Sequence, residues 1–500
     1  MTTTRAVVAL AVSRVEYLLT SPWLIGAIAL LALSSGTVAV TGAKDLTEHR
    51  ERYALEIQQR LRASLLSVGP TGRQAERALR VVRPPTEAAL LIPGQERSMP
   101  AAWDLGPATV EALPPYPDLA LRPSIVSGGG ADGAAIIGQF GGTLALALGL
   151  ATVLRDRRRG WGDAERHTAA PAFAFVVAHL SSACLTLAVA VAAWFAAIGL
   201  AVSQANGHDW ADANQTLWML APLTWLYAVT LYGYGAAIAW QVRVPLRAVV
   251  CGALLWLGLF MVGPQLGASW VGWSNDASSR ASAEQDQRDA YAERVRLLEA
   301  ELGRQIAARV GDARLSSEKE SRAIQGFQAL EPMWIRGMVG ARAAADDLQH
   351  FWRAGADRTT QRLQQAARFM PSTLLPVVLA EVSGTGHLTR RRWEQAVTEY
   401  KRRLDQALFD NRPTVTLRLP LDGLPEVFMH IRHPVLPIRD LPSFVPPSIT
   451  PEDRWQSSAT AVLILALHAA AALMFAGVAQ RRAWRRYDFV SVSAIDNGRP

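Results

Sequence analysis

The stretch AAIIGQFGGTLALALGLATVLRDRRRGW, residues 134–161, joins an apolar run to a dense basic cluster. The run, Ala134–Leu154, contains no Asp, Glu, Lys or Arg and has the length of a helix that crosses a bilayer. Four arginines then follow within five positions. Because a charged side chain costs about 2.5 to 3.5 kcal/mol at the bilayer centre, we expect the span to end at Leu154.

Further uncharged apolar runs predict an all-α polytopic membrane protein with six transmembrane helices. The first run is longer than the apolar core of a secretory signal, so we interpret it as a retained span. Val7–Leu19, which precedes it, is typical of an amphipathic helix at the membrane surface, and a disordered N-terminus is the alternative. The predicted spans are Pro22–Val40, Ala134–Leu154, Pro171–Val202, Met219–Gln241, Ala248–Trp270 and Ser457–Gln480.

The distribution of arginine predicts the orientation of these spans. With both termini placed inside the cell, the inner segments hold 14 basic and 6 acidic residues, and the outer segments hold 37 of each. The formal net charge of +8 then lies wholly on the inner side, as the positive-inside rule requires. Because this excess is divided among short loops and a tail, no basic domain is present for a nucleic acid to bind.

Two long outer stretches interrupt the spans and predict an extracytoplasmic domain that is mainly helical. The second should contain helices at 278–310, 316–330, 341–368, 372–382 and 390–409, with a strand at Thr414–Leu421. In the first, Leu46–Leu66 has a helical pattern, and prolines make the remainder irregular. The predicted units are 1–43 (surface helix and span 1), 44–133 (first insertion), 134–270 (spans 2–5, with a loop at 155–170), 271–456 (second insertion) and 457–500 (span 6 and basic tail).

Motifs that carry enzyme chemistry are absent from the sequence. None of the three lysines follows a glycine as the phosphate-binding G-x-x-x-x-G-K-[ST] loop requires, so we expect no ATPase activity and no bound cofactor. There is no H-E-x-x-H, both cysteines fall in predicted spans, and His430 and His433 lie in a segment that looks extended. We therefore predict no catalytic residue and no metal site.

Two histidines, His179 and His468, fall inside predicted spans. A polar side chain there usually faces the interior of the bundle. One interpretation is a polar path through the membrane, and the other is plain hydrogen bonding between helices. The cluster at 155–159 also has two interpretations, as an anchor that fixes topology or as a docking element for a soluble partner.

The order of these elements resembles the permease subunits of ABC transporters of the type-2 exporter class, in particular a bacterial branch with a large extracytoplasmic insertion. In that class a cytoplasmic coupling helix with a motif similar to E-R-E-x-G-T follows the second span. The segment 369–400, with its S-G-T-G turn, and LPSF at 441–444 resemble further family elements. The residues that align with this motif are Asp156, Arg157, Arg158, Arg159, Gly160 and Trp161. Arg158 and Trp161 depart from the pattern.

The resemblance implies a permease of the bacterial inner membrane with its large domain on the periplasmic side. It implies that a separate cytoplasmic ATPase binds the ATP, and that a second identical or homologous permease subunit completes the complex. Asp156–Trp161 would couple to the ATPase, with Arg243 and Arg247 as secondary candidates. The alternative is a non-transporting scaffold that transmits force to an envelope partner. A membrane-anchored enzyme is disfavoured because no catalytic constellation is found.

Overall fold

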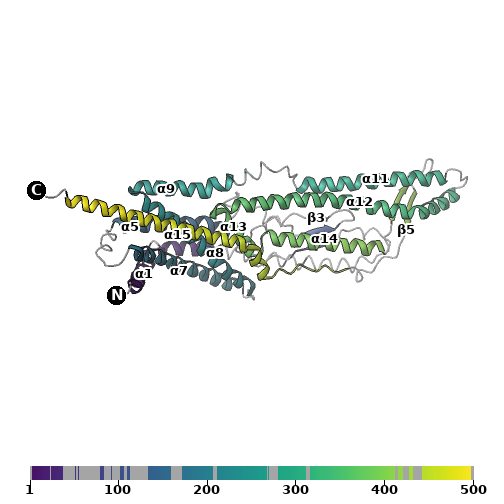
Figure 1. Cartoon of the computed structure of the whole chain (residues 1–500). Coiled ribbons are helices and arrows are strands. Elements are labelled where there is room, and N and C mark those ends of the chain that lie inside the picture. Colours follow the sequence, from purple (N-terminus) through teal and green to yellow (C-terminus); the bar gives the residue numbers. More distant parts are fainter. Residues whose placement is uncertain are drawn as a thin grey trace.

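A computed structural model shows an elongated, mainly helical molecule (Figure 1). A bundle of apolar helices forms one end, and long polar helices with two small sheets form the other. Both termini lie at the bundle end of the molecule. The residues that the structure describes are 3–22, 24–37, 51, 55, 79–83, 92, 102–105, 110–112, 133–158, 172–206, 211–266, 269, 280–310, 316–410, 415–419, 427–431 and 442–496.

Four helices in the described part of the chain are long and apolar enough to cross a membrane. A fifth span results if Val7–Leu19 and Leu24–Thr37 count as one helix pair bent by 58°. The length and composition of these helices indicate a helical membrane protein, and the count of six spans remains a prediction. The four are Ile136–Arg158 (η4, Ile136–Gly141, and α5, Gly142–Arg158), Phe173–Leu200 within α7 (Ala172–Asn206), Pro245–Leu266 (starting with α9, Pro245–Leu257, and η5, Gly258–Val262) and Pro451–Trp484 within α15 (Pro451–Asp496).

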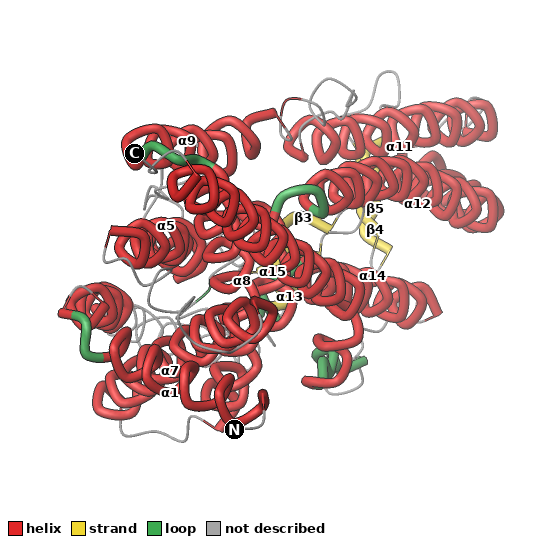
Figure 2. Tube along the Cα trace, turned by 60° about the vertical axis from the view of Figure 1, so that its left-hand side comes forward, coloured by secondary structure: helices red, strands yellow, loops and turns green. Residues whose placement is uncertain are grey.

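The predicted span Met219–Gln241 forms most of α8 (Ala211–Gln241), the central helix of the bundle (Figure 2). It packs against α5, α7 and α15, and Leu223 and Leu231 are completely buried. Because other helices surround it, α8 can carry buried Tyr and Thr side chains that lipid would not solvate. This polar content explains why α8 is less apolar than the four candidate spans.

Glycines bring α5 and α8 into backbone contact. A Cβ at Gly149 of α5 would overlap the backbone of Tyr232, and a Cβ at Gly235 of α8 would overlap the backbone of Leu146. Small residues at such crossings let helix backbones approach closely, which favours van der Waals packing in the membrane. The two helices are therefore tightly joined along their length.

The long helices α11 (Arg280–Val310) and α12 (Ser316–Ala367) form an antiparallel hairpin that projects from the bundle (Figures 1 and 2). The prediction of a helix at 278–310 is confirmed. The prediction of two helices with a break between 330 and 341 is wrong, because α12 continues through Pro332. Pro332 lies in the part of α12 that packs against α11, and the side chain of Leu298 on α11 contacts Gly337 about one turn after the proline. Tertiary packing thus overrides the local proline signal.

The other end of the hairpin returns to the bundle through α13 (Pro371–Val382), which packs against α8 and α15. A turn then leads into α14 (His387–Asp410), and the predicted helices at 372–382 and 390–409 are both confirmed. In this turn Gly384 has a φ of +74°, a conformation that glycine adopts readily. The hydroxyl of Thr385 donates to the carbonyl of Ile92 at 2.9 Å and ties the turn to the first insertion.

Among the described residues two small antiparallel sheets complete the fold. The first has the order β1 (Leu79–Val82), β2 (Ala102–Leu105), β3 (Val110–Ala112), and its Trp103 stacks on Trp393 of α14 with ring centroids 6.0 Å apart. This part of the first insertion was predicted to be irregular. The strand predicted at 414–421 is confirmed as β4 (Val415–Leu419), which pairs with β5 (Val427–Ile431). The predicted helix Leu46–Leu66 falls almost entirely outside the described residues.

Candidate functional site

The predicted coupling residues begin in the last turn of α5. Asp156, Arg157 and Arg158 are helical, whereas Arg159, Gly160 and Trp161 lie outside the described residues. Of the three helical residues only Arg158 is exposed, since Asp156 and Arg157 are half-buried against neighbouring helices. All six were predicted to couple to a separate ATPase, which stays a prediction, and the structure gives Asp156 and Arg157 contacts inside the bundle.

Arg157 closes the C-terminus of α8. Its guanidinium donates to the carbonyl oxygens of Ala239 and Val242, both at 2.8 Å, and of Arg243 at 3.1 Å. The last carbonyls of a helix have no partner within the helix, and a cation there also interacts favourably with the helix dipole. Arg157 therefore fastens the end of α5 to the end of α8.

Asp156 and Arg155 fasten the same turn to α1 (Thr3–Leu19). The Arg14 guanidinium lies 3.3 Å from the Asp156 carboxylate, and Arg155 stacks over the ring of Tyr17 at 4.4 Å. Arg14 is only 6% exposed. The N-terminal segment was predicted to lie at the membrane surface as an amphipathic helix. It is helical, but its arginine points into the bundle.

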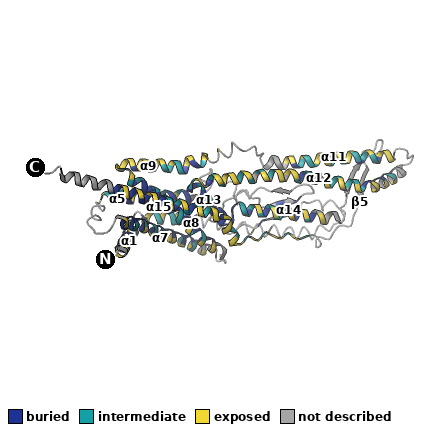
Figure 3. Ribbon diagram, viewed as in Figure 1, coloured by how far each residue is buried: buried dark blue, intermediate teal, exposed yellow. Residues whose placement is uncertain are grey.

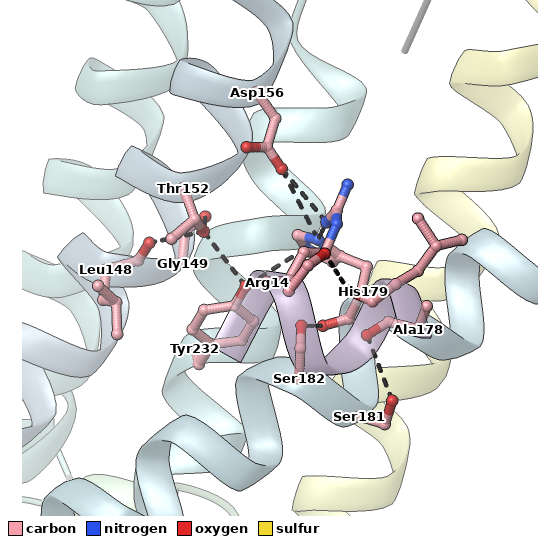
Figure 4. Close-up of polar contacts among 12 residues, drawn as sticks. Arg14, Leu148, Gly149, Thr152, Asp156, Ala178, His179, Ser181, Ser182 and Tyr232 are labelled. Carbon is pink, nitrogen blue, oxygen red and sulfur yellow. Dashed lines mark hydrogen bonds and ion pairs between the residues drawn. The ribbon is translucent and has the colours of Figure 1, made fainter. Parts of the chain in front are cut away.

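A chain of hydrogen bonds runs from Arg14 across α7 to α8 and α5 (Figure 4). Arg14 can only donate, so Nδ1 of His179 accepts and the proton of the neutral ring sits on Nε2. That Nε2–H donates to the Tyr232 hydroxyl at 3.3 Å, and Tyr232 donates to Thr152 at 3.2 Å. The chain ends where Thr152 donates to the carbonyl of Leu148 at 2.8 Å.

These residues form one polar cluster, in which each buried group has a partner. Taking an ion pair out of water costs several kcal/mol per ion, and only good geometry with further hydrogen bonds offsets this cost. An ionisable group at such a position is a functional hypothesis by default. Chemically the cluster can hold four helices together and can open if α1 moves. We define the polar cluster as Arg14, Thr152, Asp156, His179 and Tyr232.

Exposed arginines surround the cluster at this end of the bundle. Arg243 and Arg247, the predicted secondary coupling residues, lie exposed around the connection between α8 and α9. Arg481 of α15 lies 5.9 Å from the ring centroid of Phe173, near the start of α7. The ends of α5 and α8 and the starts of α7 and α9 therefore meet at one end of the bundle. We call it the basic end and define it by Arg158, Arg243, Arg247 and Arg481.

The two intramembrane histidines do not lie together. His179 belongs to the polar cluster, whereas His468 of α15 donates from Nε2 to the carbonyl of Arg368 at 3.0 Å. That carbonyl lies at the C-terminal end of α12, so His468 joins two helices. Interhelical hydrogen bonding, the second interpretation of the sequence, describes both histidines.

Sequence reasoning missed Arg14, Thr152 and Tyr232 as members of the cluster. The signal for Arg14 was a lone arginine among apolar residues, which fits a surface helix equally well. Thr and Tyr inside apolar runs carry no signal of their own until the packing partners are known. Among the described residues no group of three or more His, Cys, Asp or Glu is arranged to hold a metal ion, and His430 lies on strand β5.

Comparisons of the chain with known protein families, with curated proteins and with solved structures find no match. The geometry of the basic end is accordingly the basis on which its function is interpreted.

Proposed function

We propose that the chain is the permease subunit of an ATP-driven, ABC exporter-like complex of the bacterial inner membrane. A separate ATPase would dock at the basic end on the cytoplasmic side, and a second identical or homologous permease would complete the bundle. The α11–α12 hairpin would then stand on the extracytoplasmic side. Hydrolysis on the partner would drive export of a substrate or an outward conformational change.

The observation that carries this proposal is the fastening of the α5 terminus. Arg157 binds it to α8 and Asp156 binds it to α1, so a force applied to this turn reaches two further helices directly. α8 in turn contacts α13, through which the hairpin joins the bundle. A push at the basic end therefore has a packed route to the opposite end of the molecule.

Arg158 offers the sharpest test, because within Asp156–Trp161 it is the described residue whose side chain is exposed. The chain is co-expressed with the products of its neighbouring genes, purified, and assayed for a co-purifying ATPase and its ATP hydrolysis. Arg158→Glu should weaken assembly with the ATPase or uncouple hydrolysis. Arg5→Glu, an exposed arginine on α1, reverses the same charge and should leave both unchanged. Failure of any ATPase to co-purify, or equal behaviour of the two variants, would remove the proposal.

The length of α12 supports a second candidate function, transmission of force to an envelope partner without transport. Its 52 residues correspond to a continuous rod of about 78 Å. A photoreactive residue at Phe351, whose side chain is 74% exposed on this rod, should cross-link to that partner in intact cells. Cross-linking together with ATP hydrolysis that moves no substrate in sealed vesicles favours this function, and transport without a cross-linked partner favours the exporter.

A further inference from the structure

The C-terminal part of α12 and the turn after it present an exposed face on which this segment places three arginines and no acid of its own. Residues 358–380 contain three arginines and no Asp or Glu. The nearest acid before them, Asp357, is directed to α14, where its carboxylate lies 3.5 Å from His387. Positions i, i+3, i+4, i+7, i+10 and i+11 share one side of a helix. These positions are Arg358, Gln361, Arg362, Gln365, Arg368 and Phe369, all exposed, and we call them the arginine face.

Contacts with two candidate spans fix the depth of this face. The hydroxyl of Ser372 donates to the carbonyl of Leu259, and the carbonyl of Arg368 accepts from His468. Leu259 lies 14 residues after the start of the span Pro245–Leu266, and His468 lies 16 residues before the end of the span Pro451–Trp484. At 1.5 Å per residue, both contacts are about 21 to 24 Å from the basic end.

A hydrocarbon core of about 30 Å then places the turn after α12 roughly 6 to 9 Å below the membrane boundary on the hairpin side. Phe369, 79% exposed, lies at the depth of the acyl chains. Arg358 lies ten residues earlier and hence about 15 Å further out, so the face crosses the headgroup layer. Arg368 can reach that layer by extending its long side chain outward.

We propose that the arginine face binds the phosphate of an anionic phospholipid in the membrane leaflet on the hairpin side. Guanidinium groups suit phosphate because they donate several hydrogen bonds from a planar fork. The two glutamines add neutral donors between the arginines, and Phe369 contacts the acyl chains below. The depth of the arginine face favours a lipid over a soluble anion, because the face carries the arginines and also an aromatic side chain at the level of the acyl chains. The inference rests on the membrane assignment and needs no ATPase.

Lipid binding is measured by native mass spectrometry of the full chain in neutral detergent, titrated with dioctanoyl phosphatidylglycerol or dioctanoyl phosphatidylcholine. The wild type should retain phosphatidylglycerol far better than phosphatidylcholine. A juxtamembrane arginine contributes about fivefold to such binding, so Arg358→Gln, Arg362→Gln and Arg368→Gln together should weaken it roughly 100-fold. The single change Arg362→Gln should weaken it about fivefold, which gives a reading even if the triple variant folds poorly.

A matched variant removes three exposed arginines elsewhere and has the same net charge. Equal loss in that variant would show that binding follows total charge and would overturn the inference. The inference also fails if the wild type binds both lipids alike or if excess inorganic phosphate displaces phosphatidylglycerol. The matched changes are Arg296→Gln, Arg304→Gln and Arg402→Gln, at side chains 75%, 76% and 66% exposed on α11 and α14.

Discussion

Two acidic side chains in the described part of the chain, the half-buried Asp156 and the buried Glu381, have partners of different kinds. Asp156 at the basic end pairs with a charged side chain, Arg14, on a separate helix. Glu381 on the hairpin side is 8% exposed and accepts hydrogen bonds from the backbone N–H groups of His387 and Leu388, at 2.7 and 3.2 Å. One acid thus depends on a neighbouring helix, and the other on the start of the next helix in the chain.

This difference determines which contact can open. The donors of Glu381 are the first N–H groups of α14, only six and seven residues away, so they move with the turn that holds the acid. Arg14 lies on α1, which is joined to the next helix through a bend of 58°. A movement of α1 separates Arg14 from Asp156 while α5 stays in place. Figure 3 shows mixed burial along α1, whereas α13 near Glu381 is mostly buried.

The largest effect should come from removing one half of the basic-end pair. Arg14→Met leaves the half-buried Asp156 without its cation, and because breaking a fully buried pair costs about 3 to 5 kcal/mol, the loss here should be about 3 kcal/mol or less. Arg14→Met combined with Asp156→Leu removes both charges and should recover most of the loss. Thermal unfolding of the purified chain in detergent measures both variants. Equal destabilisation by the single and double variants would show that the two residues do not act as a pair.

A smaller effect should come from interrupting the hydrogen-bond chain at Tyr232. Tyr232→Phe removes the acceptor of the His179 Nε2–H and leaves a buried donor unsatisfied, at a cost of about 1 to 3 kcal/mol. Tyr234→Phe, at a half-buried tyrosine of the same helix, is the control and should have little effect. The same unfolding assay applies. If both substitutions cost the same, the loss reflects general packing of α8, and the chain of hydrogen bonds through Tyr232 contributes nothing.

Periodicity and charge predicted much of the helical fold, because a membrane restricts the backbone to few structures. The four candidate spans, α11, α13, α14 and β4 were all foreseen from such patterns. The continuity of α12 through Pro332 was not predicted, because it depends on the packing of α11 alongside. The three-stranded sheet was also missed, because its short strands are stabilised by α14 through the Trp103–Trp393 contact.

The candidate site was predicted less completely than the fold. The motif around 156 directed attention to the last turn of α5, but it did not predict the direction of the side chains there. Arg157 and Asp156 look like a solvated charge run in sequence, and their partners are carbonyls of α8 and a side chain 142 residues earlier. Long-range partners of this kind leave no local pattern. Coupling to an ATPase stays a prediction.

The smallest effect should appear at Glu381 as a dependence of stability on pH. Burial raises the pKa of Glu381 above its ordinary value of 4.5, although the N–H groups of Leu388 and His387 oppose the shift. Between 4.5 and the raised pKa the folded chain binds more protons than the unfolded chain, so its stability increases as the pH is lowered through this window.

Glu381→Gln cannot titrate and keeps one of the two acceptor oxygens, so one backbone N–H loses its acceptor at a cost of about 1 kcal/mol that is the same at every pH. Melting temperatures of wild type and variant are compared from neutral pH down to the ordinary glutamate range. The wild type should gain stability relative to the variant as the pH falls, and the difference removes the contributions that the two proteins share. Parallel curves would mean that the Glu381 carboxylate is as well stabilised as in water, and that Asp156 and Glu381 differ less than their partners suggest.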